Sequence, residues 1–167
     1  MTNDLVALIA NIALALSFIA GLIFGIGQVK AAARDRRERL TLEALRNFQT
    51  HEFAELIYFV TWTKLPTNRQ EMDALPTEDR IKFIQFGQEM ESLGILLAEK
   101  LIDIDLVDKT LGSLVSTAWE KYKPVIFSMR DKDPFLSEYF QWLAENIDKR
   151  LKENPRTPFY KINPDAE

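Results

Sequence analysis

Four residues in the second half of the chain have the types and spacing of a small binding pocket. Trp119 and Arg130 lie three turns apart in one stretch of helical apolar spacing, and Glu91 or Asp103 supplies a carboxylate. In such a pocket the guanidinium binds an anionic ligand or a partner carboxylate through two parallel hydrogen bonds. The alternative, which is favoured for side chains in an apolar stripe, is core packing with a structural ion pair.

The acidic run that begins at Asp103 has part of the spacing of a calcium-binding loop. Asp105 and Asp108 follow it, but Asp108 stands at the sixth position, where the loop needs glycine. Leu114 stands at the twelfth position, where the loop needs glutamate. We therefore predict that these aspartates cap a helix, and we expect no metal site.

The histidine and cysteine content excludes several kinds of chemistry. His51 is the only histidine and the chain has no cysteine, which excludes thiol chemistry, the usual zinc sites and di-iron bundles of the usual form. Neither a phosphate-binding glycine loop nor a Gly-x-Ser-x-Gly elbow occurs. We predict that His51 is a surface or helix-capping residue, and we expect neither enzymatic activity nor a cofactor. A carboxylate-dependent hydrolase would depend on the acidic clusters alone.

The elements that position these residues begin with a long apolar segment. Residues 5–29 contain no charged residue, and about 20 helical residues are enough to cross the hydrocarbon core of a bilayer. A cleaved signal peptide has a basic start and a shorter apolar run, of about 7–15 residues. Here the start is Met-Thr-Asn-Asp. We therefore predict an uncleaved transmembrane helix.

Charge predicts the orientation of this helix. The net charge is −4 overall, with six basic and three acidic residues in 30–50, and 15 basic and 21 acidic residues in 51–167. Basic residues beside a span mark its cytoplasmic side and bind anionic lipid headgroups. We thus expect residues 1–4 outside and residues 30–167 inside. The acidic body argues against nucleic acid as a partner. The basic collar next to the span comprises Lys30, Arg34, Arg36, Arg37 and Arg39.

Small side chains recur every four residues within the apolar segment. Ala13, Ser17, Gly21 and Gly25 share one helical face, and the amide of Asn11 lies near it. Such a face lets a second helix approach closely, which drives association in lipid, where the hydrophobic effect does not. We predict that the span self-associates or pairs with another membrane protein.

The remainder of the chain has helical apolar spacing throughout, which predicts an all-α protein. The span continues as a basic juxtamembrane helix over residues 30–50, a bundle of about four helices occupies 51–153, and 154–167 form an extended tail. Within the bundle we expect helices that start near Phe53, at a Thr77 cap, after Asp103 and at Asp133-Pro134. We also expect a polar loop at 65–76 and a kink or break at Pro124. The predicted buried stripe of the helix that starts at Thr77 comprises Ile81, Ile84, Met90, Leu93, Leu97 and Leu101.

The order of residues over about 80–145 resembles a bacterial family of membrane-anchored helical domains of unknown function. That family has a Gly-Leu-Ile-Asp-x-Asp-Leu-Val turn, then a helix with Trp, Pro and Arg, then an aromatic last helix. The matching residues here are Leu101-Ile-Asp-Ile-Asp-Leu-Val107, Trp119, Pro124, Arg130 and Tyr139-Phe140, and Lys100 replaces the glycine. The resemblance implies a bacterial source, and hence the inner membrane, but brings no catalytic residues.

These observations predict a membrane-anchored cytoplasmic interaction or scaffold protein, with lipid and a second copy or another membrane protein as its partners. The alternative is a small oligomeric membrane effector, such as a pore-forming or defence protein. The span has no charged residue to line a water-filled path, which argues against a pore.

Overall fold

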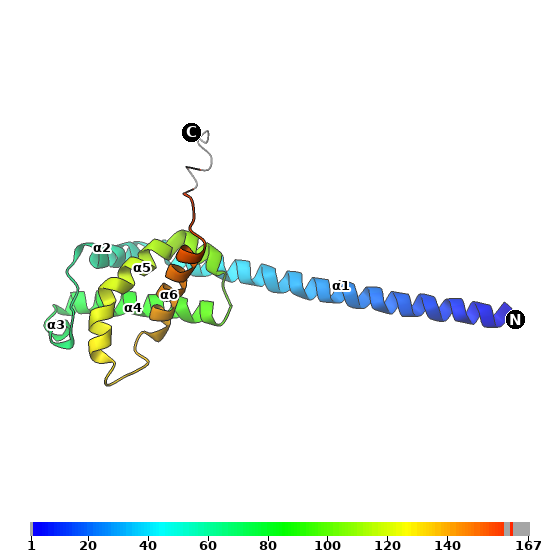
Figure 1. Ribbon diagram of the computed structural model, residues 1–167, viewed down its shortest axis with the longest axis horizontal. Coiled ribbons are helices and arrows are strands. Elements are labelled where there is room, and N and C mark those ends of the chain that lie inside the picture. Colours follow the sequence, from blue (N-terminus) through cyan, green and yellow to red (C-terminus); the bar gives the residue numbers. More distant parts are fainter. Residues whose placement is uncertain (1, 159–160, 162–167) are drawn as a thin grey trace. The chain divides into compact units, whose positions relative to one another are not determined.

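The computed structural model describes residues 2–158 and 161 and is all-α, as the sequence predicts (Figure 1). Within the described residues the chain forms six helices: α1 Thr2–Asn47, α2 His51–Trp62, α3 Arg69–Asp73, α4 Thr77–Ala98, α5 Ile104–Met129 and α6 Glu138–Glu153. Contacts divide the chain into two units, residues 1–39 and residues 40–167.

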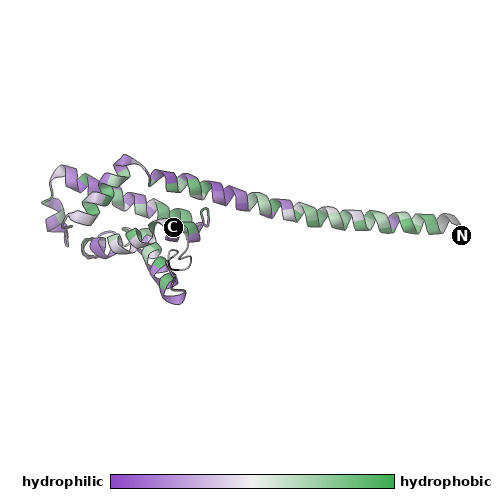
Figure 2. Ribbon diagram, turned by 90° about the horizontal axis from the view of Figure 1, so that it is seen from above, coloured by the Kyte–Doolittle hydropathy of each residue, from purple (hydrophilic) through white to green (hydrophobic). Residues whose placement is uncertain are grey.

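The first unit is the apolar and basic part of α1. Every side chain of residues 5–29 is exposed apart from the half-buried position Gly25, and Figure 2 shows hydrophobic residues giving way to hydrophilic ones further along α1. A helix that is apolar on all sides is stable only where its whole surface is buried, in a protein core or in a membrane. The segment is long and apolar enough to cross a membrane, which is consistent with a membrane anchor or a signal sequence.

The second unit has its core around an aromatic cluster. Phe86 of α4, Tyr122 of α5 and Phe140 of α6 are fully or almost fully buried. The ring centroid of Tyr122 is 5.5 Å from that of Phe86 and 5.6 Å from that of Phe140, in tilted and edge-to-face arrangements. These geometries are the favourable ones for aromatic pairs. The Tyr122 hydroxyl donates a hydrogen bond of 2.9 Å to the Phe83 carbonyl, and burial raises the pKa of this phenol well above its usual value.

The last turns of α1 belong to this second unit. Thr41 and Leu45 are buried, and the Thr41 hydroxyl accepts a 2.8 Å hydrogen bond from the backbone N–H of Asp103. The predicted extension of the helix beyond the collar is confirmed, and its apolar side packs on the core.

Helices α4 and α6 come closest at Gly94. A Cβ atom built there would lie 2.7 Å from the carbonyl carbon of Tyr139, far inside van der Waals contact. Only glycine fits this crossing without a shift of α6.

Several predicted helix boundaries are wrong. The polar loop at 65–76 contains α3, whose first turn is capped by the Asn68 side chain. Thr77 is the first residue of α4 and not its cap, because Pro76 occupies the cap position without a side-chain hydrogen bond. Asp133 accepts from the Phe135 N–H in a turn, so α6 begins at Glu138 and not at Asp133-Pro134.

Two further predictions are wrong in part. α5 continues through Pro124 as one helix, so the predicted break does not occur, whereas the alternative of a kink stays a prediction. The predicted stripe is confirmed at Met90, Leu93 and Leu97, which are buried. It is wrong at its two ends, where Ile81, Ile84 and Leu101 are 57%, 47% and 44% exposed. The α4 residues that do face the core are Phe83, Phe86, Met90, Leu93, Gly94 and Leu97.

Candidate functional site

Glu91 of α4 caps the first turn of α6. Its carboxylate accepts hydrogen bonds from the backbone N–H groups of Tyr139 (3.2 Å) and Phe140 (2.8 Å). The N-cap residue of α6, Ser137, has a left-handed backbone (φ 53°) and makes no side-chain cap hydrogen bond. Glu91 therefore takes over the capping role from a different helix, and its negative charge stabilises the positive end of the α6 dipole.

Arg130 holds the turn that precedes α6. Its guanidinium donates to the carbonyls of Leu136 (3.0 Å) and Ser137 (3.3 Å) and to the side-chain oxygen of Gln141. The guanidinium also lies over the Phe127 ring, 5.1 Å from its centroid. These contacts order the turn, and no carboxylate of a described residue pairs with Arg130.

Trp119 and Asp103 complete the four residues of the predicted pocket. Trp119 is buried and meets Phe140 edge to face, with 5.2 Å between ring centroids. Asp103 caps α5, accepting from the N–H groups of Asp105 (2.8 Å) and Leu106 (3.3 Å), so the predicted cap is confirmed. Glu91, Arg130 and Trp119 thus converge on the start of α6, whereas Asp103 makes its hydrogen bonds at the start of α5.

The other two aspartates of the acidic run pair with arginines. Asp105 forms an ion pair with Arg150. Asp108 is buried, and Arg156 donates to both its backbone carbonyl and its carboxylate, each at 3.2 Å. Across residues 2–158 and 161, no three acidic or histidine side chains converge as a metal-binding group. His51 is the first residue of α2 and is exposed, with its Nε2 atom 3.5 Å from Oε1 of Glu55.

The small-residue face of the apolar segment has open space at its glycines. A Cβ atom added at Gly21 or Gly25 would meet nothing within 4 Å. Ala13, Ser17 and Asn11 are exposed as well.

The collar side chains are also exposed, on the helix that continues the span. Arg34 forms a 2.8 Å ion pair with Glu38, and the hydrogen bond within this pair raises the pKa of the arginine.

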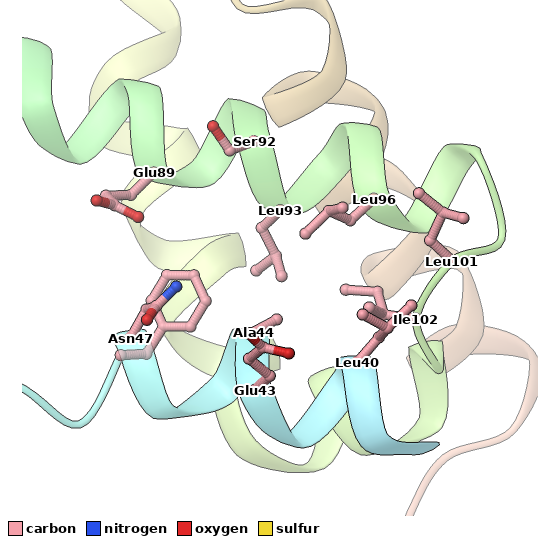
Figure 3. Close-up of a pocket in the computed structure, with 11 residues that line it drawn as sticks. Leu40, Glu43, Ala44, Asn47, Glu89, Ser92, Leu93, Leu96, Leu101 and Ile102 are labelled. Carbon is pink, nitrogen blue, oxygen red and sulfur yellow. The ribbon is translucent and has the colours of Figure 1, made fainter. Parts of the chain in front are cut away.

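A groove of about 300 Å³ lies between the end of α1 and α4 (Figure 3). Leu40 and Ala44 face Leu93 and Leu96 across it, and the carboxylate of Glu89 lies at its edge. Its remaining lining residues are Glu43, Asn47, Phe48, Ser92, Leu101 and Ile102.

A second cavity, of about 390 Å³, lies between α3, α4 and α5. Its wall is mainly apolar and includes Gly87 and Tyr122. The charged side chains on the wall are Arg69, Arg80, Asp73 and Glu91, so the structure places one residue of the predicted pocket, Glu91, in this cavity. Sequence reasoning missed this cavity, because its residues come from three helices with no common local motif. A glycine inside an otherwise apolar helical pattern was the one available signal.

These features define a class of protein: all-α, with a long apolar N-terminal helix followed by a packed helical bundle. Residues 13–147 match DUF4760, a domain of unknown function. The chain belongs to this family, which confirms the expected membership in a family without an assigned activity. No curated protein and no solved structure matches the chain. The bacterial source and the membrane anchor stay predictions.

Proposed function

We propose that the chain is a membrane-anchored interaction protein, with residues 5–29 as its span and the bundle as a cytoplasmic binding module. The observation that carries this proposal is the contrast between the two units. Residues 5–29 expose apolar side chains on all sides, whereas residues 40–167 bury a complete core without them. Exposure of that much apolar surface to water is unfavourable, and a bilayer removes the cost.

The surface of the bundle supports a role in binding another protein. Tyr58 and Trp62 lie one turn apart on α2 and are 68% and 75% exposed. Large exposed aromatic side chains are enriched at protein interfaces, because they bury much area on association. Within the described residues, the contacts inside the bundle are structural, and no catalytic constellation is needed to explain them.

The basic collar supports the orientation of the proposed anchor. Its five basic residues follow the apolar segment directly, and such residues stay on the cytoplasmic side. The small-residue face supports pairing of the span with a second copy or with another membrane protein.

Topology is tested with single introduced cysteines. The chain has no cysteine, so any thiol labelling comes from the introduced residue. In spheroplasts, a membrane-impermeant maleimide should label Asn3→Cys, whereas Glu52→Cys should react only after lysis. The intact mass separates an anchor from a signal sequence. An anchor leaves the full 19.3 kDa chain in the membrane, whereas cleavage removes residue 3. A soluble or shortened protein contradicts the proposal.

Assembly is tested by the detergent-corrected mass of the full chain. We expect an oligomer for the wild type and loss of assembly in Gly21→Ile/Gly25→Ile, since the added side chains hold helices apart. Gly27→Ile is the matched control, because Gly27 lies off the four-residue face and its Cβ also meets nothing within 4 Å. Equal masses for all three proteins would exclude pairing through this face.

A further inference from the structure

The second cavity has the size and wall of a small-molecule site. Its volume of about 390 Å³ falls in the range of ligand pockets, about 300–1,000 Å³. The apolar wall combines long flexible side chains, such as Met72 and Met129, with the rings of Phe83 and Tyr122. A wall of this kind adapts to an unbranched apolar chain.

Gly87 keeps the cavity open at a cost to α4. Glycine inside a helix is about 1 kcal/mol less favourable than alanine. No close helix crossing requires it here, because an added Cβ would meet only the Tyr122 ring, in ordinary contact at 3.6 Å. The missing side chain instead leaves space in the wall of the cavity.

One charge on the cavity wall has no counterion. The Nε atom of Arg69 lies 3.5 Å from Oδ2 of Asp73. The carboxylate of Glu91 accepts hydrogen bonds from the first N–H groups of α6. Arg80 is half-buried, and no ion pair or side-chain hydrogen bond joins it to another described residue. Arg80 also lines the cavity, and an arginine without a counterion beside an apolar cavity suits an anionic group with an apolar tail.

We propose that this cavity binds an amphipathic carboxylate of the fatty-acid class. The carboxylate pairs with Arg80, and the tail occupies the space beside Gly87 between α3, α4 and α5. The cavity shares two wall residues, Glu91 and Ser137, with the capping contacts at α6.

The test uses photo-crosslinking of the full-length protein in lipid nanodiscs, or in buffer alone if residues 5–29 do not hold it in a bilayer. The probes are a diazirine-bearing decanoic acid and the matching decanol. Labelling of the protein is normalised to the amount of probe, which is measured from adducts on the nanodisc lipid or, in buffer, from the probe concentration. We expect the acid to label peptides that carry Met72, Tyr122 or Met129.

Two variants and one control decide the result. Arg80→Gln should lower labelling by the acid about tenfold, equivalent to about 1.4 kcal/mol, and leave labelling by the alcohol unchanged. Gly87→Met should lower labelling by both probes, because its side chain occupies the space beside α4 that the proposed tail takes. Arg69→Gln, which removes an exposed arginine already close to Asp73, should change labelling by less than about twofold.

The proposal is overturned if the acid labels no cavity peptide, or if Arg80→Gln labels like the wild type. It is also overturned if Gly87→Met leaves labelling intact. Circular dichroism melting of each variant shows whether the bundle stays folded, and Gly87→Ala, which adds one methyl group in ordinary contact, provides a second and milder filling variant.

Discussion

Replacement of Glu91 by alanine removes the acceptor of two backbone N–H groups at the start of α6. These hydrogen bonds are 3.2 and 2.8 Å long, and no side-chain cap at Ser137 replaces them. A hydrogen bond to a charged group contributes about 1.5–3 kcal/mol net, and loss of a helix cap costs about 0.5–2 kcal/mol. Because Glu91 is half-buried, water recovers part of the loss, and we expect a destabilisation of about 2 kcal/mol.

The assay is thermal and denaturant unfolding of the full chain in mild detergent. For a bundle of this size, a loss of about 2 kcal/mol lowers Tm by about 8 °C. Glu91→Gln keeps an acceptor oxygen but loses the charge, so it should cost about half as much. Hydrogen exchange should quicken at the amides of Tyr139 and Phe140 before it does elsewhere in the core.

The matched control is Glu89→Ala, which removes a half-buried glutamate from the same helix without removing a cap. If Glu91→Ala and Glu89→Ala unfold at the same midpoint, or if the two α6 amides keep their protection, then Glu91 does not cap α6 and the reasoning is refuted.

Three further substitutions test the packing of α4 and α5, each by the same unfolding measurement. Gly94→Ala should destabilise the bundle by about 1–3 kcal/mol, because the new Cβ meets the Tyr139 backbone; a neutral effect would contradict the close crossing. Gly87→Ala on the same helix should have the opposite sign and stabilise by up to about 1 kcal/mol, since its Cβ has room. Tyr122→Phe should cost about 1 kcal/mol through the lost hydrogen bond to the Phe83 carbonyl. Burial raises the pKa of Tyr122 well above 10.0. The neutral phenol therefore contributes stability that is fully present below pH 10 and is lost as the pH rises toward the folded pKa. Above pH 10, the free energy of unfolding should fall less steeply in Tyr122→Phe than in the wild type.

The features predicted correctly from the sequence are those set by local pattern. A run of apolar residues without charge indicates a long exposed or membrane helix, and Asp103 before a periodic apolar stretch indicates a cap, because an aspartate side chain reaches the next backbone N–H groups. Both depend on residues a few positions apart. The overall class, an apolar helix before a helical bundle, follows from them.

The features that were missed depend on partners far apart in the sequence. Glu91 was predicted as a pocket carboxylate and does line the second cavity, but its role as the cap of a helix that begins 47 residues later was not predicted. The start of the stripe on α4 was misplaced because Ile81 and Ile84 have the same helical spacing as Phe83 and Phe86. Periodicity identifies two overlapping apolar faces there, and only packing against α2 and α6 selects the one that is buried.

Helix α4 packs against helices that are synthesised before and after it, which affects how the nascent chain folds. Its apolar face is covered on one side by α2 and most extensively by α6, which starts 40 residues after α4 ends. At about 5–20 residues per second, the ribosome leaves this face open for at least about two seconds after α4 is made. The nascent chain is therefore open to chaperones, and to early pairing with a neighbouring chain, until α6 emerges and closes over Gly94.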